Sequence, residues 1–167
     1  MKMHMAGICG TDKHAFKGEK VLYGGTEAEQ EIVYPGVRGH ENVGTIVEMR
    51  EKDQDWIEYH GQRLKIGDRV TMCPNIICKK CWYCRHILAY PFCAENTTIG
   101  LSFKSIEWPY VAGGWAEYMY VPAGSWVYKV PDEMSTEIAA LTELMVVAAT
   151  LDRAKEFSRM EARGFGF

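Results

Sequence analysis

The sequence contains no long hydrophobic run and no cluster of basic residues. Its most apolar stretch, residues 144–151, is far shorter than the roughly 20 residues that cross a bilayer, and the start MKMHMAGICG lacks the apolar core of a signal peptide. Acidic and basic residues are nearly balanced, with 22 Asp plus Glu against 19 Lys plus Arg. Binding to nucleic acid or to an anionic membrane needs clustered Lys and Arg. We therefore expect a cytoplasmic protein that has neither nucleic acid nor membrane as a partner.

Internal repeats and low-complexity tracts are also missing. Instead, glycines and prolines separate short runs rich in Val, Ile, Tyr and Thr, a pattern typical of a mainly β protein with a few helices. The length of 167 residues and the hydrophobic content of 47% fit one domain. We predict strands at residues 2–8, 42–50, 69–72, 116–121 and 126–129, and a solvated loop at residues 51–62.

A helical pattern follows near the C-terminal end of the sequence. Ser135 suits the N-cap position, and Glu137 places a carboxylate in the first turn, where the helix dipole favours it. Apolar residues then recur at helical spacing and predict a buried stripe of Leu144, Val147, Ala148 and Leu151. Residues 162–167 show no packing pattern, and their two glycines do not make a phosphate-binding loop because no strand precedes them.

The cysteines carry the strongest chemical signal. Five of the six lie between positions 73 and 93, and four of these have the spacing C-x2-C-x2-C-x8-C, namely Cys78, Cys81, Cys84 and Cys93. Short spacers turn successive thiolates onto one ion, and four thiolates leave no open position. The pattern therefore predicts a structural zinc that folds the lobe at residues 74–95. In a reducing compartment, such clusters bind metal more often than they form disulfides.

Three other interpretations of the cluster stay open at this point: a disulfide pair, an iron–sulfur cluster and a chance spacing. In ferredoxin-type patterns the fourth cysteine is usually followed by proline, whereas Ala94 follows Cys93 here. Cys73 lies at the end of a predicted strand, where a free cysteine is usually a small buried residue, and we leave it out of the site.

Other candidate residues are scattered along the chain. Taken singly, a histidine such as His40 is more often a hydrogen-bonded structural residue, and a glutamate such as Glu143 more often compensates a helix dipole. Taken in order, however, the motifs resemble the zinc-containing medium-chain alcohol dehydrogenases, in their threonine and sorbitol dehydrogenase-like branch. The matching segments are GICGTD at 7–12, GHE at 39–41 with the strand NVGTIVEM, GDRV at 67–70, the four-cysteine lobe, GGWAEY at 113–118, VPD at 130–132 and AALTE at 139–143.

The resemblance implies a GroES-like β-barrel catalytic domain with a second, catalytic zinc. In the family, the cysteine of GICGTD and the histidine of GHE are ligands of this zinc, and a third ligand comes from the position that Glu143 occupies here. The implied ligands are therefore Cys9, His40 and Glu143, with water or substrate in the fourth place. Zinc in such an open site acts as a Lewis acid on an alcohol hydroxyl, and the alcohol carbon gives its hydride to a nicotinamide.

Four further site residues are implied by the same motifs. Thr11 and His14 match the relay that carries the alcohol proton away. Asp12 matches the carboxylate that orients the ligand histidine, and Glu41 matches the acidic neighbour that approaches the metal. An alternative role for Asp12 is the N-cap of a short helix at residues 13–17. The remaining histidines show no partner spacing and are expected at the surface: His4, His60 and His86.

The chain also departs from the family pattern. Lys79 and Ile87 stand where glycines are common in the lobe, and Leu144 rather than proline follows Glu143. Family members have further strands before GICGTD and continue into a Rossmann domain that binds the nicotinamide. The resemblance thus divides the chain into a catalytic domain at residues 1–142, which includes the lobe, and a linking helix at residues 143–167 toward a cofactor domain that is absent from this chain.

The expectation is the catalytic domain of a zinc-dependent alcohol or polyol dehydrogenase that uses NAD or NADP. We expect the 167-residue chain to bind zinc without dehydrogenase turnover, and the full-length protein to be a homo-oligomer. The competing interpretation is a stand-alone, non-catalytic zinc-binding interaction domain. The intact implied site argues against it, because a scaffold has no need of an open zinc position.

Overall fold

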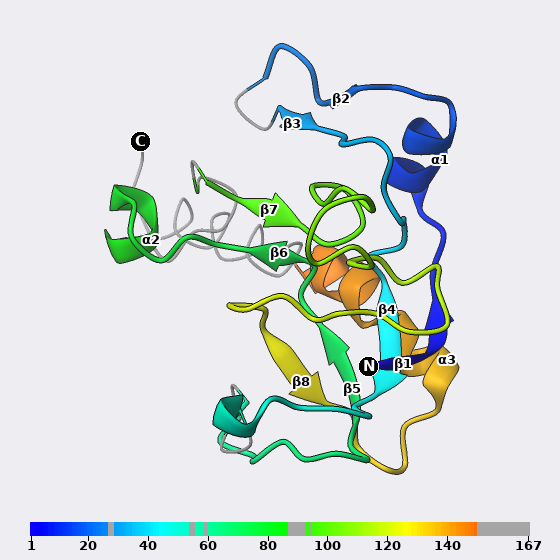
Figure 1. Ribbon diagram of the computed structural model, residues 1–167, viewed down its shortest axis with the longest axis vertical. Coiled ribbons are helices and arrows are strands. Elements are labelled where there is room, and N and C mark those ends of the chain that lie inside the picture. Colours follow the sequence, from blue (N-terminus) through cyan, green and yellow to red (C-terminus); the bar gives the residue numbers. More distant parts are fainter. Residues whose placement is uncertain (27–28, 54–55, 59, 87–92, 94, 150–167) are drawn as a thin grey trace, which may run out of the picture.

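The computed structural model describes residues 1–26, 29–53, 56–58, 60–86, 93 and 95–149, and it is mainly sheet with a few short helices, as predicted (Figure 1). In chain order the elements are β1 (Lys2–Ala6), α1 (Gly10–Phe16), β2 (Val21–Leu22), β3 (Gln30–Glu31), β4 (Asn42–Thr45), a 3-10 helix (Glu51–Asp53), β5 (Arg69–Met72), β6 (Asn75–Ile76), α2 (Trp82–His86), β7 (Thr97–Thr98), β8 (Val127–Lys129) and α3 (Thr136–Ala140). A further helical run covers 142–149.

The central sheet is antiparallel and has the strand order β1-β4-β5-β8. Two smaller antiparallel pairs, β2 with β3 and β6 with β7, lie outside it. Figure 1 shows α1 and the β2–β3 pair at one end of the molecule, while β6 runs from the end of β5 toward α2. The sheet therefore positions α1 and the cysteine lobe.

Alternation along the strands divides the core between the two faces of the sheet. Val70 belongs to the larger apolar cluster, whose other buried members are Leu64, Met72, Ile76, Ile99, Met119 and Val127. Val43, on the neighbouring strand, instead packs with Val130 and with Ala139 and Ala140 of α3. Because successive side chains of a strand point to opposite faces, both faces of β4 and β5 are covered.

The strand predictions are confirmed in part. β5 has the predicted bounds, whereas β1, β4 and β8 are shorter than predicted. The strand predicted at 116–121 is wrong, because this described segment forms an isolated bridge between Tyr118 and Lys2 and single backbone hydrogen bonds with Met1, Met3 and Val111 rather than a continuous ladder. The predicted loop at 51–62 is also more structured than expected, since it holds the 3-10 helix and the buried Glu58, whose carboxylate accepts the Gln62 amide.

The helix near the C-terminal end begins as predicted and then breaks. Ser135 is the N-cap of α3, and its hydroxyl accepts a hydrogen bond from the Ile138 amide at 3.3 Å. α3 ends at Ala140, and the run at 142–149 exposes the apolar side chains that were expected to be buried, including Leu144 and Val147. Leu151, the rest of the predicted linking helix and the tail at 162–167 lie outside the described residues. Within the described part of the chain, every helix is too short or too polar to span a membrane.

Gly113, in the GGWAEY motif, lies so close to a neighbouring segment that a larger residue does not fit. A Cβ at Gly113 would lie 2.1 Å from the carbonyl oxygen of Val37, whereas a Cβ at Gly10 would meet nothing within 4 Å. We expect Gly113→Ala to lower the free energy of unfolding by about 1–3 kcal/mol through this overpacking. Urea denaturation checks the value, with Gly10→Ala as the matched control. Equal midpoints for the two variants would contradict the expected clash.

Asp68, in the GDRV motif, connects the turn before β5 to β8. Its Oδ1 forms an ion pair with Lys129 Nζ at 2.9 Å, and its Oδ2 accepts the Lys65 amide at 2.9 Å. Burial raises the pKa of the Asp68 carboxyl, but these two hydrogen bonds and the charges of both lysines lower it overall. The ionised carboxylate therefore stabilises the fold above the ordinary aspartate pKa of about 3.9, and this contribution is lost as the pH falls through the lower folded value.

Asp68→Asn is accordingly expected to destabilise the chain by about 1 kcal/mol at neutral pH, because the pair is partly screened by solvent. The difference from the wild type should persist down to about pH 5 and shrink toward pH 3. Urea midpoints measured across this range provide the check. A difference that grew on acidification would contradict the assigned direction of the pKa shift.

Candidate metal centres

The four cysteines of the lobe converge as their spacing predicted. The sulfur atoms of Cys78, Cys81, Cys84 and Cys93 all lie within 4.8 Å of one another. The Cys78 and Cys84 sulfurs are 3.9 Å apart, and a tetrahedron with bonds of about 2.3 Å to zinc requires a separation of about 3.8 Å. None of the six cysteines forms a disulfide, so the arrangement is not a disulfide framework. These residues fit a closed, four-sulfur metal site.

Hydrogen bonds and burial prepare the lobe for a cation. Backbone amides donate to three sulfurs: Cys81 N to Cys78 Sγ at 3.3 Å, Cys84 N to Cys81 Sγ at 3.5 Å and Cys78 N to Cys93 Sγ at 3.3 Å. Burial, together with the neighbouring Cys81 and Cys93 thiols, raises the pKa of Cys84 to about 12. A thiol in such surroundings keeps its proton unless a cation replaces it. The cluster therefore suits a bound metal better than a set of free thiolates.

Two positions that depart from the family pattern lie in or near this lobe. Lys79 has a positive φ of 59°, the left-handed conformation that glycine adopts most readily. This geometry explains why glycine is common there, and Lys79 adopts it at some cost in strain. Ile87 lies outside the described residues. Cys73, which the sequence placed among small buried residues, is only partly buried and belongs to neither group of metal-ligating residues found in the described chain.

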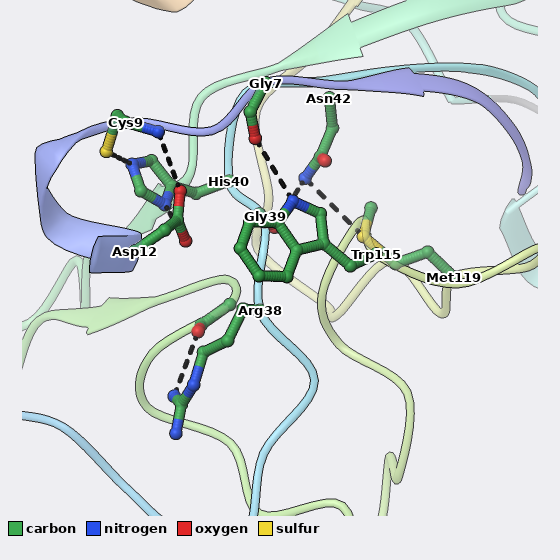
Figure 2. A network of polar contacts seen from close by, with 10 residues as sticks. Gly7, Cys9, Asp12, Arg38, Gly39, His40, Asn42, Trp115 and Met119 are labelled. Atoms are coloured by element: carbon green, nitrogen blue, oxygen red, sulfur yellow. Dashed lines mark hydrogen bonds and ion pairs between the residues drawn. The ribbon is translucent and has the colours of Figure 1, made fainter. Parts of the chain in front are cut away.

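A second group of donors forms where β1 leads into α1. Cys9 is the N-cap of α1, and His40 lies two residues before the start of β4, in the GHE motif. The Cys9 sulfur lies 3.0 Å from His40 Nε2, and Figure 2 shows the two side chains pointing toward each other. Cysteine and histidine ligands of one tetrahedral zinc are separated by about 3.5 Å, given bonds of about 2.3 and 2.0 Å. A small separation of the two side chains would admit the ion.

The third member of this group is Asp12, which is fully buried. Its Oδ2 accepts the Cys9 amide at 3.1 Å, and its Oδ1 faces His40 Nδ1 at 3.6 Å. That distance exceeds a hydrogen bond, and both facing atoms are buried without a hydrogen-bond partner. A slight rotation of the His40 ring would pair them, as expected when Nε2 turns toward a metal. The alternative of Asp12 as an N-cap is wrong, because α1 begins at Gly10 and Asp12 occupies its third position.

Three carboxylates surround His40. Burial lowers the pKa of the imidazole, but the Asp12 carboxylate that faces it and the charges of Glu143 and Glu41 raise it overall. Burial raises the pKa of Glu143; the charge of His40 lowers it and that of Glu41 raises it, and the pKa stays raised overall. The Glu143 carboxylate nevertheless lies outside the group of donors that approach within 4.8 Å. The described structure thus brings Cys9, His40 and Asp12 together, with Glu143 and Glu41 contributing negative potential that favours a divalent cation.

Contacts between remote motifs hold this arrangement in place. The Gly114 and Trp115 amides donate to the carbonyls of Gly39 and Arg38, both at 2.9 Å, and the Trp115 indole donates to the Gly7 carbonyl at 3.2 Å. Figure 2 shows the indole between the GICGTD and GHE segments. The Arg38 side chain points away from the Cys9–His40 pair and donates to the Gly100 carbonyl. GGWAEY therefore positions the other two motifs, a role that the sequence alone did not assign to Trp115.

Thr11 and His14 lie on one face of α1 and line a cleft of about 440 Å³. The same cleft is lined by Glu19, whose Oε2 lies 2.7 Å from His14 Nδ1. Sequence reasoning missed Glu19, although the glycine before it is a signal that the chain reverses after the helix. Of the remaining histidines, His4, His60 and His86 are exposed, as expected.

Comparisons with known proteins agree with this geometry. Residues 1–132 match the alcohol dehydrogenase GroES-like domain. The chain is 31% identical over 141 residues to L-threonine 3-dehydrogenase of Pseudoalteromonas translucida, covering 84% of this chain and 34% of the relative. It is 32% identical over 147 residues to the enzyme of the same name from Coxiella burnetii, covering 86% of this chain and 35% of the relative. The chain thus spans about a third of the length of the curated relatives it matches.

Solved structures show the same fold. An alcohol dehydrogenase from Thermotoga maritima superposes with a TM-score of 0.70 at 24% identity, covering 85% of this chain and 36% of that one. A zinc-binding dehydrogenase from Sinorhizobium meliloti, bound to NADP, superposes with a TM-score of 0.59 at 27% identity, covering 84% and 33%. The family expected from the sequence is confirmed: this chain belongs to the alcohol dehydrogenase GroES-like domain family.

Proposed function

We propose that this chain is the catalytic, zinc-binding domain of a dehydrogenase that oxidises an alcohol or polyol with NAD or NADP. One observation carries the proposal: the Cys9–His40 pair, with Asp12 behind the imidazole, differs in kind from the closed four-cysteine lobe. A four-sulfur site is complete, whereas two donors backed by a buried carboxylate leave room for a substrate oxygen. A chain that needed zinc only for folding would require the lobe alone.

In this proposal Cys9, His40 and Glu143 would hold the catalytic zinc. The bound metal supplies a Lewis acid that lowers the pKa of the substrate hydroxyl. Asp12 accepts the Nδ1 proton of His40 and so keeps Nε2 free for the metal. Glu41, packed against Gly7, adjusts the charge at the site.

The proton leaves along α1. Thr11 accepts a hydrogen bond from the substrate hydroxyl and donates its own proton to His14, which is exposed and returns it to solvent. Both side chains line the 440 Å³ cleft, which is a suitable place for the substrate. The names of the threonine dehydrogenase relatives favour a small secondary alcohol as that substrate.

We further propose that residues 1–142 form the catalytic domain, that 74–95 form the structural zinc lobe within it, and that 143–167 lead toward the part of the longer relatives that binds the nicotinamide. A cytoplasmic location is supported by the absence of a disulfide among the six cysteines, which suits a reducing compartment. We also propose that the full-length protein is a homo-oligomer. The 167 residues alone should bind zinc without NAD(P)-dependent turnover.

Cobalt substitution tests the open character of the Cys9–His40 site. Co²⁺ in place of zinc should give two distinguishable sets of visible absorption bands, one from the four-sulfur lobe and one from the Cys9–His40 site. Adding a small alcohol or imidazole should shift only the second set, because only that site has room for an exogenous ligand. Absorption bands that do not shift with any added ligand would contradict a catalytic role and favour the non-catalytic interaction domain.

A further inference from the structure

The C-terminal end of α1 folds the chain back onto the helix. The Gly18 amide donates to the Ala15 carbonyl at 3.0 Å, and the Glu19 amide donates to the His14 carbonyl at 3.2 Å. These two bonds, with Gly18 at a φ of +80°, make up a Schellman motif. The helix cap itself therefore returns Glu19 to the turn of α1 that carries His14.

Tyr34 fastens this reversal from outside the helix. Its hydroxyl lies 2.6 Å from the Ala15 carbonyl oxygen and 2.8 Å from the Glu19 carbonyl oxygen, and it donates to this pair of acceptors. The guanidinium carbon of Arg38 lies over the Tyr34 ring, 4.5 Å from the ring centroid. The backbone of Glu19 is thus held by the helix cap and by a side chain from the segment that precedes His40.

The Glu19 carboxylate meets one particular nitrogen of His14. Oε2 lies 2.7 Å from Nδ1, and an ionised carboxylate can only accept a hydrogen bond. The proton of a neutral His14 ring must therefore reside on Nδ1, which leaves Nε2 as an acceptor. About half of each side chain is exposed, so the pair contributes little to stability. The consequence of the pair is that it selects the Nδ1–H tautomer of His14.

We propose that Glu19 is a positioning residue that holds His14 in the Nδ1–H tautomer, with Nε2 ready to receive a proton at the cleft. Thr11 and His14 are three positions apart on α1, hence on one helix face, and both line this cleft with Glu19. When Nε2 accepts the Thr11 hydroxyl proton, Thr11 takes the proton of the substrate hydroxyl. The resulting imidazolium is paired with the Glu19 carboxylate until solvent removes the proton. This assignment rests on the proposed function only for the source of that proton.

The tautomer of His14 is measurable by two-bond ¹H–¹⁵N correlation spectra of the ¹⁵N-labelled chain, at about pH 9, where an ordinary imidazole is neutral. The wild type should show the Nδ1–H tautomer. In Glu19→Ala the Nε2–H tautomer, which a free histidine side chain prefers, should become the major form. Glu107→Ala, which removes an exposed carboxylate paired with Lys104, serves as the control and should leave the His14 signals unchanged.

An Nε2–H tautomer in the wild type, or an unchanged tautomer in Glu19→Ala, would overturn the assignment. The measurement needs neither substrate nor turnover. If the cobalt experiment failed while the tautomer switched as expected, the proposed dehydrogenase function would fall and the role of Glu19 in fixing His14 would stand.

Discussion

Replacing Cys84 with serine is expected to release the zinc of the lobe and to lower the melting temperature by about 10 °C or more. Cys84 is buried, and its sulfur lies 3.9 Å from that of Cys78. Besides the cysteines, the cluster is supported only by Ile77 and Trp126 among the described residues. Without the ion, the remaining thiols would be protonated, and the metal would no longer connect the cysteines of the lobe.

Native mass spectrometry and thermal unfolding measure the two effects together. The wild type should carry two zinc ions and Cys84→Ser one. Cys73→Ser is the matched control, because Cys73 is a free cysteine outside both groups of donors, and it should retain two ions with little change in melting temperature. Two zinc ions in Cys84→Ser, or one in Cys73→Ser, would show that these four cysteines are not the ligands of the zinc in the lobe.

The second large effect is expected at Asp12. Asp12→Asn should weaken zinc binding at the Cys9–His40 site by about 10–100-fold, the usual result when the carboxylate behind a histidine ligand is lost. An asparagine oxygen can still accept the Cys9 amide, so α1 keeps its N-terminal hydrogen bond. The lost property is the negative charge that faces His40 Nδ1 at 3.6 Å. Affinity should therefore fall while the fold is preserved.

Competition with a fluorescent zinc chelator resolves the weaker site from the lobe. Asp53→Asn is the control, because Asp53 ends a 3-10 helix without buried residues and forms an ion pair with Arg50. This variant should bind both ions as the wild type does. Equal affinities in Asp12→Asn and Asp53→Asn would mean that the buried carboxylate does not orient a ligand histidine.

The lobe was predictable because its information is local. Two-residue spacers can bring the side chains of Cys78, Cys81 and Cys84 together whatever the rest of the chain does, and the structure places their sulfurs close to that of Cys93. The second site is different, since Cys9 and His40 are 31 positions apart and carry no spacing signal. Only the resemblance of their motifs to a family related them, and the contacts of Trp115 explain physically why those motifs meet.

Other features depend on tertiary contacts that no local pattern encodes. The segment at 116–121 alternates like a strand, yet its backbone forms one isolated bridge and a few single hydrogen bonds, with the first residues of the chain and with Val111. The apolar run at 142–149 has helical periodicity, but Leu144 and Val147 are exposed in the structure. Glu19 became recognisable only once the cap of α1 returned it to His14. The role of Glu143 as third ligand stays a prediction.

The most direct test of the open second site is an anomalous difference map at the zinc absorption edge, from crystals of the chain grown with zinc and soaked briefly in a weak chelator. Two peaks are expected, one amid the four sulfurs of the lobe and one between Cys9 Sγ and His40 Nε2. A single peak in the lobe, with Cys9 and His40 still 3.0 Å apart as they are now, would contradict this expectation.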